Sequence, residues 1–165
     1  MITSRRDYLL RLIDEAARLL ARVVLKRQTG APEDALAALV QGCERLFELE
    51  ADKLFQLTPE QHFALLADVE TPELGRDRVL LYAAFNAEAG PLYRTLGRPT
   101  LARASLLNAL RLTLRAHLEF PIQGLPAYAP DIAALRQALA DEPLDPVTLE
   151  LLTAVARRIE PKIAE

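Results

Sequence analysis

The stretch GPLYRTLGRPTLARASLLNAL, residues 90–110, decides the fold because two helical segments meet there at a tight turn. Gly97 supplies the turn, since glycine adopts backbone angles that other residues avoid. Ala102 is small enough for two antiparallel helices to approach closely, and Tyr93 fills the space between them. These residues predict a helical hairpin.

Outward from this hairpin, the spacing of apolar residues is helical through almost the whole chain, and no strand pattern stands out. Glycine and proline mark the breaks, and several expected helices begin with a proline in the first turn. The expected helices cover residues 4–28, 31–50, 58–69, 76–96, 99–117, 131–140 and 145–164. The sequence therefore predicts an all-α, antiparallel helical array of about seven helices.

Residues 120–130, FPIQGLPAYAP, interrupt this pattern with three prolines and one glycine. Such a density of helix breakers predicts an extended connector. The chain then divides into a helical domain at 1–119, the connector, and a helical pair at 131–165 that caps the same domain. Pro161 is expected to kink the last helix near its end.

The composition favours packing of helix on helix. Hydrophobic residues make up 51% of the 165 residues, aromatic residues make up only 5%, and there is no Trp. A chain of this length buries about 70% of its unfolded surface in one domain, so it needs no metal or disulfide for stability. The formal net charge of −3 supplies no basic field for nucleic acid.

Three features bear on location. Cys43 is the single cysteine, which excludes an internal disulfide and favours a reducing compartment. No apolar run approaches the roughly 18 residues that span a membrane. Residues 3–6, TSRR, look like a twin-arginine export signal, but charged residues break the apolar run of roughly 7–15 residues that such a signal needs. We therefore expect a retained first helix, a cytoplasmic protein and no membrane partner.

The first expected helix is apolar over a wider arc than one packing contact needs. The residues of this arc are Leu9, Leu12, Ile13, Ala16, Leu19, Leu20, Val23 and Val24. Such a helix buries two sides, either between helices of its own chain or against a second copy in a homodimer. Alanine at Leu12 and Leu19 is a test of the dimer, because loss of that interface would change the native mass.

The hairpin resembles a tetratricopeptide repeat at six positions of its signature, which are Gly90, Tyr93, Gly97, Ala102, Leu106 and Ala109. A weaker match, offset by 67 residues (97 − 30), runs through Gly30, Ala35, Leu39 and Gly42. That offset is close to two periods of about 34 residues. The resemblance implies pairs of antiparallel helices, with a degenerate unit between the two matches.

The order of parts also resembles a family of small bacterial proteins known as a domain of unknown function. Residues 6–9 match its opening basic-Asp-Tyr-Leu pattern, and an Ala-rich second helix and a tetratricopeptide-like pair come after them. The similarity covers residues 6–119. It implies a helical fold and no particular activity.

Two features depart from the tetratricopeptide pattern. Pro91 removes a backbone donor within the first helix of the best match, so we expect a kink or break at Gly90-Pro91. Repeats of this family that grip peptide C-termini carry Lys, Asn and Arg on their inner helices. The corresponding residues here are apolar or acidic, namely Leu20, Val24, Ala84, Ala87 and Glu88. A groove formed by them would prefer apolar or basic ligands.

Candidate catalytic or metal-binding residues are few. His62 and His117 are the only histidines and lack further ligands at metal-binding spacing, and Cys43 fits a buried core residue. Phosphate-binding and nucleophile motifs are absent, so we expect no cofactor and no metal. Arg111 and Arg115 share a helix face, where a solubilising role is favoured over an anion-binding one.

The pattern favours a non-enzymatic module that binds a protein or peptide segment in an apolar groove and forms a homodimer. This hypothesis rests on fold-level analogy. The alternative is a small-ligand sensor or an enzyme with a pocket near Gly90-Pro91. The candidate ligand or partner surface consists of Tyr82, Asn86, Tyr93 and Arg94. A nucleic-acid role comes third, because the net charge disfavours it.

Overall fold

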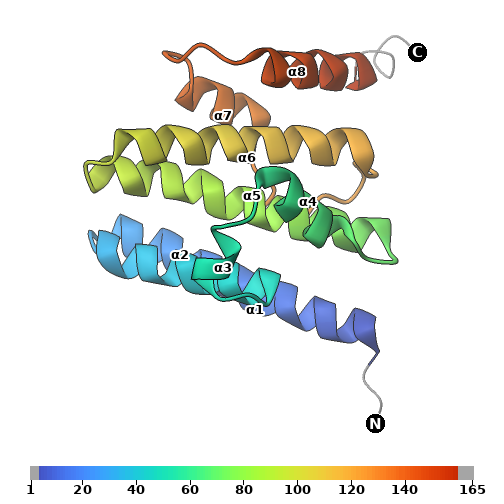
Figure 1. The fold of residues 1–165 in the computed structure, drawn as a ribbon, viewed down its shortest axis with the longest axis horizontal. Helices are drawn as coiled ribbons and strands as arrows, with labels where there is room; N and C mark the ends of the chain where they lie inside the picture. The colour runs from blue at the N-terminus through green and yellow to red at the C-terminus, as the bar shows by residue number, and fades with distance from the viewer. Residues whose placement is uncertain (1–3, 160–165) are drawn as a thin grey trace.

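The computed structural model describes residues 4–159, which form eight α-helices and no strand (Figure 1). The helices are α1 (Arg5–Gln28), α2 (Pro32–Phe47), α3 (Ala51–Leu54), α4 (Pro59–Ala67), α5 (Pro72–Thr95), α6 (Pro99–Glu119), α7 (Ile132–Ala138) and α8 (Pro146–Ile159). The predicted all-α helical array is confirmed. The prediction missed α3 and started α5 late; Pro161 lies outside the described residues.

The helices begin where local chemistry favours it. The hydroxyl of Ser4 accepts a hydrogen bond from the backbone N–H of Asp7 at 3.1 Å and so caps α1. Thr58 and Gln61 form a reciprocal capping box at the start of α4. Proline occupies the first turn of α2, α4, α5 and α6, where its missing N–H costs no helical hydrogen bond.

The pairs α1–α2 and α5–α6 are two helical hairpins of the same design. Their first helices are each 24 residues long, and each turn contains a glycine with positive φ, 76° at Gly30 and 72° at Gly97. In both turns the residue after the glycine donates its N–H to the carbonyl five residues earlier, at 2.8 Å. The 67-residue offset seen in the sequence is therefore also the offset between the two turns.

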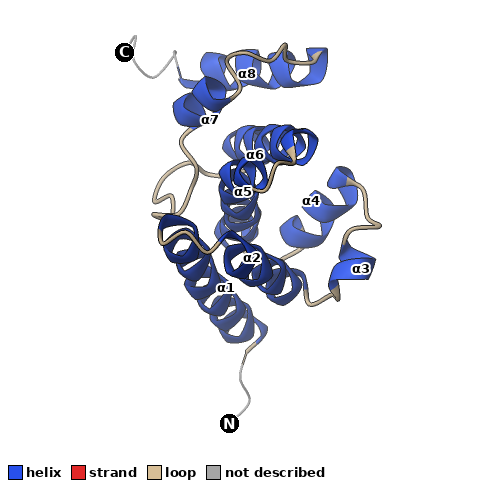
Figure 2. Ribbon diagram, turned by 90° about the vertical axis from the view of Figure 1, so that its left-hand side faces the viewer, coloured by secondary structure: helices blue, strands red, loops and turns tan. Residues whose placement is uncertain are grey.

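The segment between the hairpins does not form a layer of the stack. The helix α5 packs directly against α1 and α2, whereas α3 and α4 lie to one side of them (Figure 2). With 4 and 9 residues, α3 and α4 are too short to cover a 24-residue helix. The degenerate unit expected between the two matches is therefore a lateral addition.

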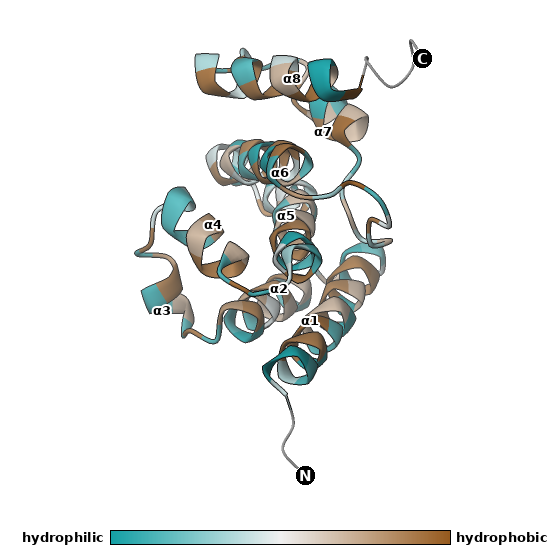
Figure 3. Cartoon of the chain, turned by 90° about the vertical axis from the view of Figure 1, so that its right-hand side faces the viewer, coloured by the Kyte–Doolittle hydropathy of each residue, from teal (hydrophilic) through white to brown (hydrophobic). Residues whose placement is uncertain are grey.

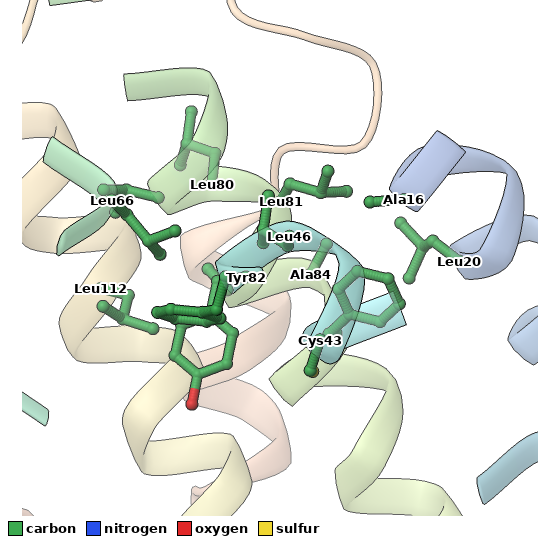
Figure 4. Packing of buried hydrophobic residues seen from close by; sticks show 14 of the residues in the cluster. Ala16, Leu20, Cys43, Leu46, Leu66, Leu80, Leu81, Tyr82, Ala84 and Leu112 are labelled. Atoms are coloured by element: carbon green, nitrogen blue, oxygen red, sulfur yellow. The ribbon is translucent and has the colours of Figure 1, made fainter. Parts of the chain in front are cut away.

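The wide apolar arc of α1 is buried within the chain. Leu12, Ala16 and Leu20 belong to one hydrophobic core with residues of α2 and α5. Figure 4 shows Ala16 and Leu20 on the side of α1 that faces Leu81 and Ala84. This arrangement matches the within-chain alternative. Because Leu12 is a core residue, alanine at that position would test the core and not a dimer interface.

The outer face of α6 carries the last two helices. Leu106, Leu110 and Leu114 of α6 form a second hydrophobic cluster with Leu135 of α7 and Val155 of α8. Figure 3 shows α7 and α8 stacked beyond α6, on the opposite side of the molecule from α1 and α2. The long helix α6 therefore has apolar contacts on two sides.

The connector at 120–130 is held against α5 by one buried arginine. The guanidinium of Arg76 donates to the carbonyls of Pro121 and Gln123 at 2.8 Å and of Gly124 at 3.0 Å. The hydroxyl of Tyr128 donates to the carbonyl of Asp77 at 3.0 Å. These bonds satisfy backbone carbonyls that a helix or sheet would otherwise engage.

Candidate functional site

Tyr82, the first of the four candidate surface residues, is part of the core. Its ring packs against those of Phe47 and His62, with centroid distances of 4.8 and 5.4 Å. A carbonyl oxygen only accepts, so the Nε2–H of His62 donates to the carbonyl of Leu54 at 2.7 Å. In this tautomer the proton is on Nε2, and Nδ1 accepts the hydroxyl of Tyr82 at 3.3 Å. Burial raises the pKa of Tyr82.

Asn86 lies one helical turn after Tyr82 and is joined to it. Its amide donates to the Tyr82 carbonyl at 2.9 Å, and its side-chain oxygen accepts from Asn108 of α6 at 3.2 Å. The structure therefore brings Tyr82 and Asn86 together on α5. Their polar groups are occupied by partners within the chain, which makes this pair a structural link between α5 and α6.

Tyr93 and Arg94 lie about two turns further along α5. Tyr93 is half-buried and packs against the main core, whereas Arg94 is exposed and donates to the carbonyl of Ala138 in α7 at 3.2 Å. The structure does not gather these two residues with Tyr82 and Asn86. Whether any of the four contacts a ligand or partner stays a prediction.

The region around Gly90-Pro91 is tightly packed on the side that faces α6. A Cβ atom at Gly90 would overlap the side chain of Leu106, so glycine is needed for this close approach. The helix α5 continues through Pro91 to Thr95, so of the expected kink or break the break is wrong, and the kink stays a prediction. The neighbouring helix fills the space that a ligand pocket would need on this side.

A cavity does form at the inner positions named in the sequence. All five of these residues, Leu20, Val24, Ala84, Ala87 and Glu88, line a cavity of about 240 Å³ together with Tyr128 and Pro130. Its walls come from α1, α5 and the connector. We call this feature the inner groove. The carboxylate of Glu88 pairs with Arg27 of α1 at 2.9 Å.

The connector residues of the inner groove were not identified from the sequence. Tyr128 packs against the main core, and burial, together with the nearby Asp77 carboxylate, raises its pKa. The signal that could have found it is an aromatic residue with a polar tip in a proline-rich segment, because such a residue is seldom left in water. The path of the connector depends on Arg76, which nothing in the local pattern marks as a buried anchor.

The remaining reactive groups, Cys43 and His117, are buried or bonded within the chain. Burial raises the pKa of Cys43 to about 12, and Glu44 adds to this effect, so the thiol is not ionised at neutral pH. The Nδ1–H of His117 donates to the carbonyl of Thr113 one turn earlier, at 2.8 Å. Among residues 4–159, no three His, Cys, Asp or Glu side chains are grouped so as to hold a metal ion.

Comparisons of the chain with protein-family models, curated proteins and solved structures found no match. Both resemblances stated from the sequence therefore stay predictions. Within the described part of the chain, no helix combines the length and the apolar character needed to cross a membrane. The function of the chain is therefore inferred from the geometry of the inner groove.

Proposed function

We propose that this protein is a non-enzymatic, tetratricopeptide-like interaction module that binds a segment of a partner protein in the inner groove. The observation that carries the proposal is the convergence of five inner-face residues from α1 and α5 on one cavity. Four of them are apolar, so they favour an apolar side chain of the partner. The cytoplasm is the expected location, because the buried Cys43 thiol suits a reducing compartment.

The charge at the rim of the groove is secondary to its apolar walls. Glu88 would attract a basic residue of the partner, but Arg27 already pairs with it. Both side chains are partly exposed, and exposed ion pairs contribute only about 0–1 kcal/mol. A basic residue of the partner could therefore replace Arg27 with little change in free energy, and burial of apolar surface decides affinity.

The connector supports an extended ligand. Tyr128 and Pro130, which lie close together in a proline-rich stretch, already contact this groove from within the chain. A partner segment would continue the same surface, with its apolar side chain between Val24 and Ala87. The hydroxyl of Tyr128 donates to the carbonyl of Asp77 at 3.0 Å, so the connector wall of the groove is held in place before a partner binds.

The test is a comparison of two variants on α1. Val24→Glu places a charge in the groove, whereas Ala21→Glu places the same charge at an exposed position that does not line it. Each tagged protein is used to recover partners from lysate of the source organism. A stoichiometric partner should be retained by wild type and Ala21→Glu and lost with Val24→Glu. Equal recovery with both variants, or no partner with wild type, would contradict the proposal.

A homodimer through α1, the other partner expected from the sequence, would need the apolar residues of α1 that the chain leaves exposed. The large ones are Leu10 and Leu25, and the aromatic ring of Tyr8 is exposed as well. The substitution Leu10→Lys should therefore change the native mass from dimer to monomer without loss of helicity. A monomeric wild-type protein would exclude this part of the proposal.

A further inference from the structure

We propose a second site, for a small amphipathic carboxylate, in an open cavity lined by α4, α6 and α8. The cavity has a volume of about 400 Å³. Arg111, Arg115 and Asn108 of α6 supply its polar lining, and Leu112, Val147 and Leu151 supply apolar lining. In Figure 3, α4, α6 and α8 lie away from α1, so this site is separate from the inner groove.

The two arginines of the cavity are held in place by contacts outside it. Arg111 donates from Nε to the Thr148 hydroxyl at 3.0 Å and pairs through Nη2 with Asp145 at 2.7 Å. Neither of those partners lines the cavity. Because the side chain is fixed at these atoms, its position needs no further ordering when a ligand binds.

Arg115 is fixed in a different way. Its guanidinium lies 3.6 Å from the ring centroid of Phe63, and its Nε donates to Glu119 at 3.1 Å. Within residues 4–159, no hydrogen bond or ion pair engages Nη1 or Nη2 of Arg115, or Nη1 of Arg111. These N–H groups are therefore the donors that a carboxylate can use.

The lining favours an anion that carries an apolar chain. Arg111 and Arg115 are the cationic residues of the lining and Glu60 is the acidic one, and the carboxylates that pair with the arginines, Asp145 and Glu119, lie outside it. The free N–H groups of the two arginines are what favours an anion. Val147 is 59% exposed although it is apolar and lines a cavity, so a hydrocarbon chain would cover a side chain that water now contacts. The volume lies in the range of roughly 300–1,000 Å³ that small-molecule sites have.

The test uses octanoate as the probe and the full chain, with calorimetry and ligand-observed NMR. Octanamide has the same chain length without the charge, and acetate has the charge without the chain. Saturable binding of octanoate is expected, with octanamide at least about tenfold weaker, as for loss of hydrogen bonds to a charged group. Equal binding of octanoate and octanamide, acetate binding as tight as octanoate, or no saturable octanoate binding would each overturn the proposal.

Variants with matched controls locate the binding. Val147→Glu should weaken the binding of octanoate at least about tenfold. Leu149 is 50% exposed on the same helix and lies outside the cavity, so Leu149→Glu should leave the affinity within about twofold of wild type. Arg115→Gln should weaken octanoate binding about tenfold. Arg103 lies on another part of α6 and pairs with Glu142, so Arg103→Gln should leave the affinity unchanged. Wild-type affinity in both Val147→Glu and Arg115→Gln would place the ligand elsewhere and refute the site.

Discussion

The hairpins α1–α2 and α5–α6 share lengths and turns but differ in how their first helices are buried. In α5, the seven consecutive residues 79–85 are all buried, because α1, α2, α4 and α6 surround this helix. Among the equivalent residues 12–18 of α1, only Leu12, Ile13 and Ala16 are buried. The same helical hairpin therefore serves once as the edge of the array and once as its centre.

The difference shows which features are local and which depend on neighbours. Both turns repeat the same glycine, proline and hydrogen bonds, since these interactions lie within one hairpin. The close contacts do not repeat. Gly42 of α2 faces Phe85 across the interface between the hairpins, whereas Gly90 of α5 faces Leu106 within the second hairpin.

The largest effect is expected where the equivalent residues differ most. Phe85 is fully buried, and 67 residues earlier α1 has the exposed Arg18. Phe85→Ala should lower the free energy of unfolding by about 3–5 kcal/mol, because it leaves a cavity in the core. Arg18→Ala should change it by less than about 0.5 kcal/mol. Urea unfolding measures both, and similar losses would contradict the central position of α5.

Gly42, the glycine of α2 at the interface between the two hairpins, gives the second prediction. A Cβ at Gly42 would overlap the ring of Phe85, so Gly42→Ala should destabilise the protein by about 1–3 kcal/mol. The smaller and more flexible side chain in Phe85→Leu should recover part of this loss in the double variant. A double-mutant cycle on urea midpoints measures the coupling. Strictly additive losses would show that the two residues do not limit each other.

The sequence was informative where structure depends on neighbours along the chain. It predicted the turns at Gly30 and Gly97. The five positions that line the inner groove were named from the tetratricopeptide resemblance and not from a local pattern. The lateral position of α3–α4 and the path of the connector were not predictable, because both depend on contacts between distant residues. Arg76 reaches carbonyls 45 to 48 residues away, and no periodic pattern encodes such a bond.

The candidate surface illustrates the same limit. Tyr82, Asn86, Tyr93 and Arg94 were grouped because they lie close together in sequence near a proline. On a helix, residues 82 and 93 lie on nearly the same face because they are about three turns apart, but that face is turned to the core: Tyr82 is buried and Tyr93 packs against the same cluster. Helical spacing shows which residues share a face and leaves open whether a neighbouring helix covers that face.

The second helices of both hairpins hold the segment that comes after them, and this gives a third prediction. At equivalent positions, Glu44 of α2 accepts the N–H of Ala51, and Arg111 of α6 pairs with Asp145. Asp145 also accepts the N–H and hydroxyl of Thr148 at the start of α8. Asp145→Asn should therefore lower stability at pH 7 by about 1 kcal/mol in urea unfolding.

The pH dependence of that difference is a further check. Hydrogen bonds from Thr148 and Arg111 hold the pKa of Asp145 below its usual range. The carboxylate therefore contributes stability above its unfolded pKa of about 3.9, and this contribution is lost as the pH falls toward the lower folded pKa. The gap between wild type and Asp145→Asn should be constant from about pH 7 to 5 and shrink below about pH 4. A gap that widens in acid would be inconsistent with this role.

The smallest effect concerns the arginine in the last turn of each first helix. Arg27 of α1 pairs with the carboxylate of Glu88 in α5, whereas the equivalent Arg94 of α5 donates to a backbone carbonyl in α7. Arg27→Met should lower stability by about 0.2–1 kcal/mol, because the pair is partly exposed. High salt should remove most of this loss, since the Debye length falls to about 3 Å at 1 M.

Arg94→Met is the matched variant, and its loss should depend less on salt because a carbonyl carries no net charge. Thermal unfolding at about 0.1 M and 1 M salt separates the two contacts. Equal salt dependence would mean that the Arg27–Glu88 pair does not join the hairpins electrostatically. The inner groove, whose rim includes Glu88, would then be shaped by the apolar contacts of α1 and α5 alone.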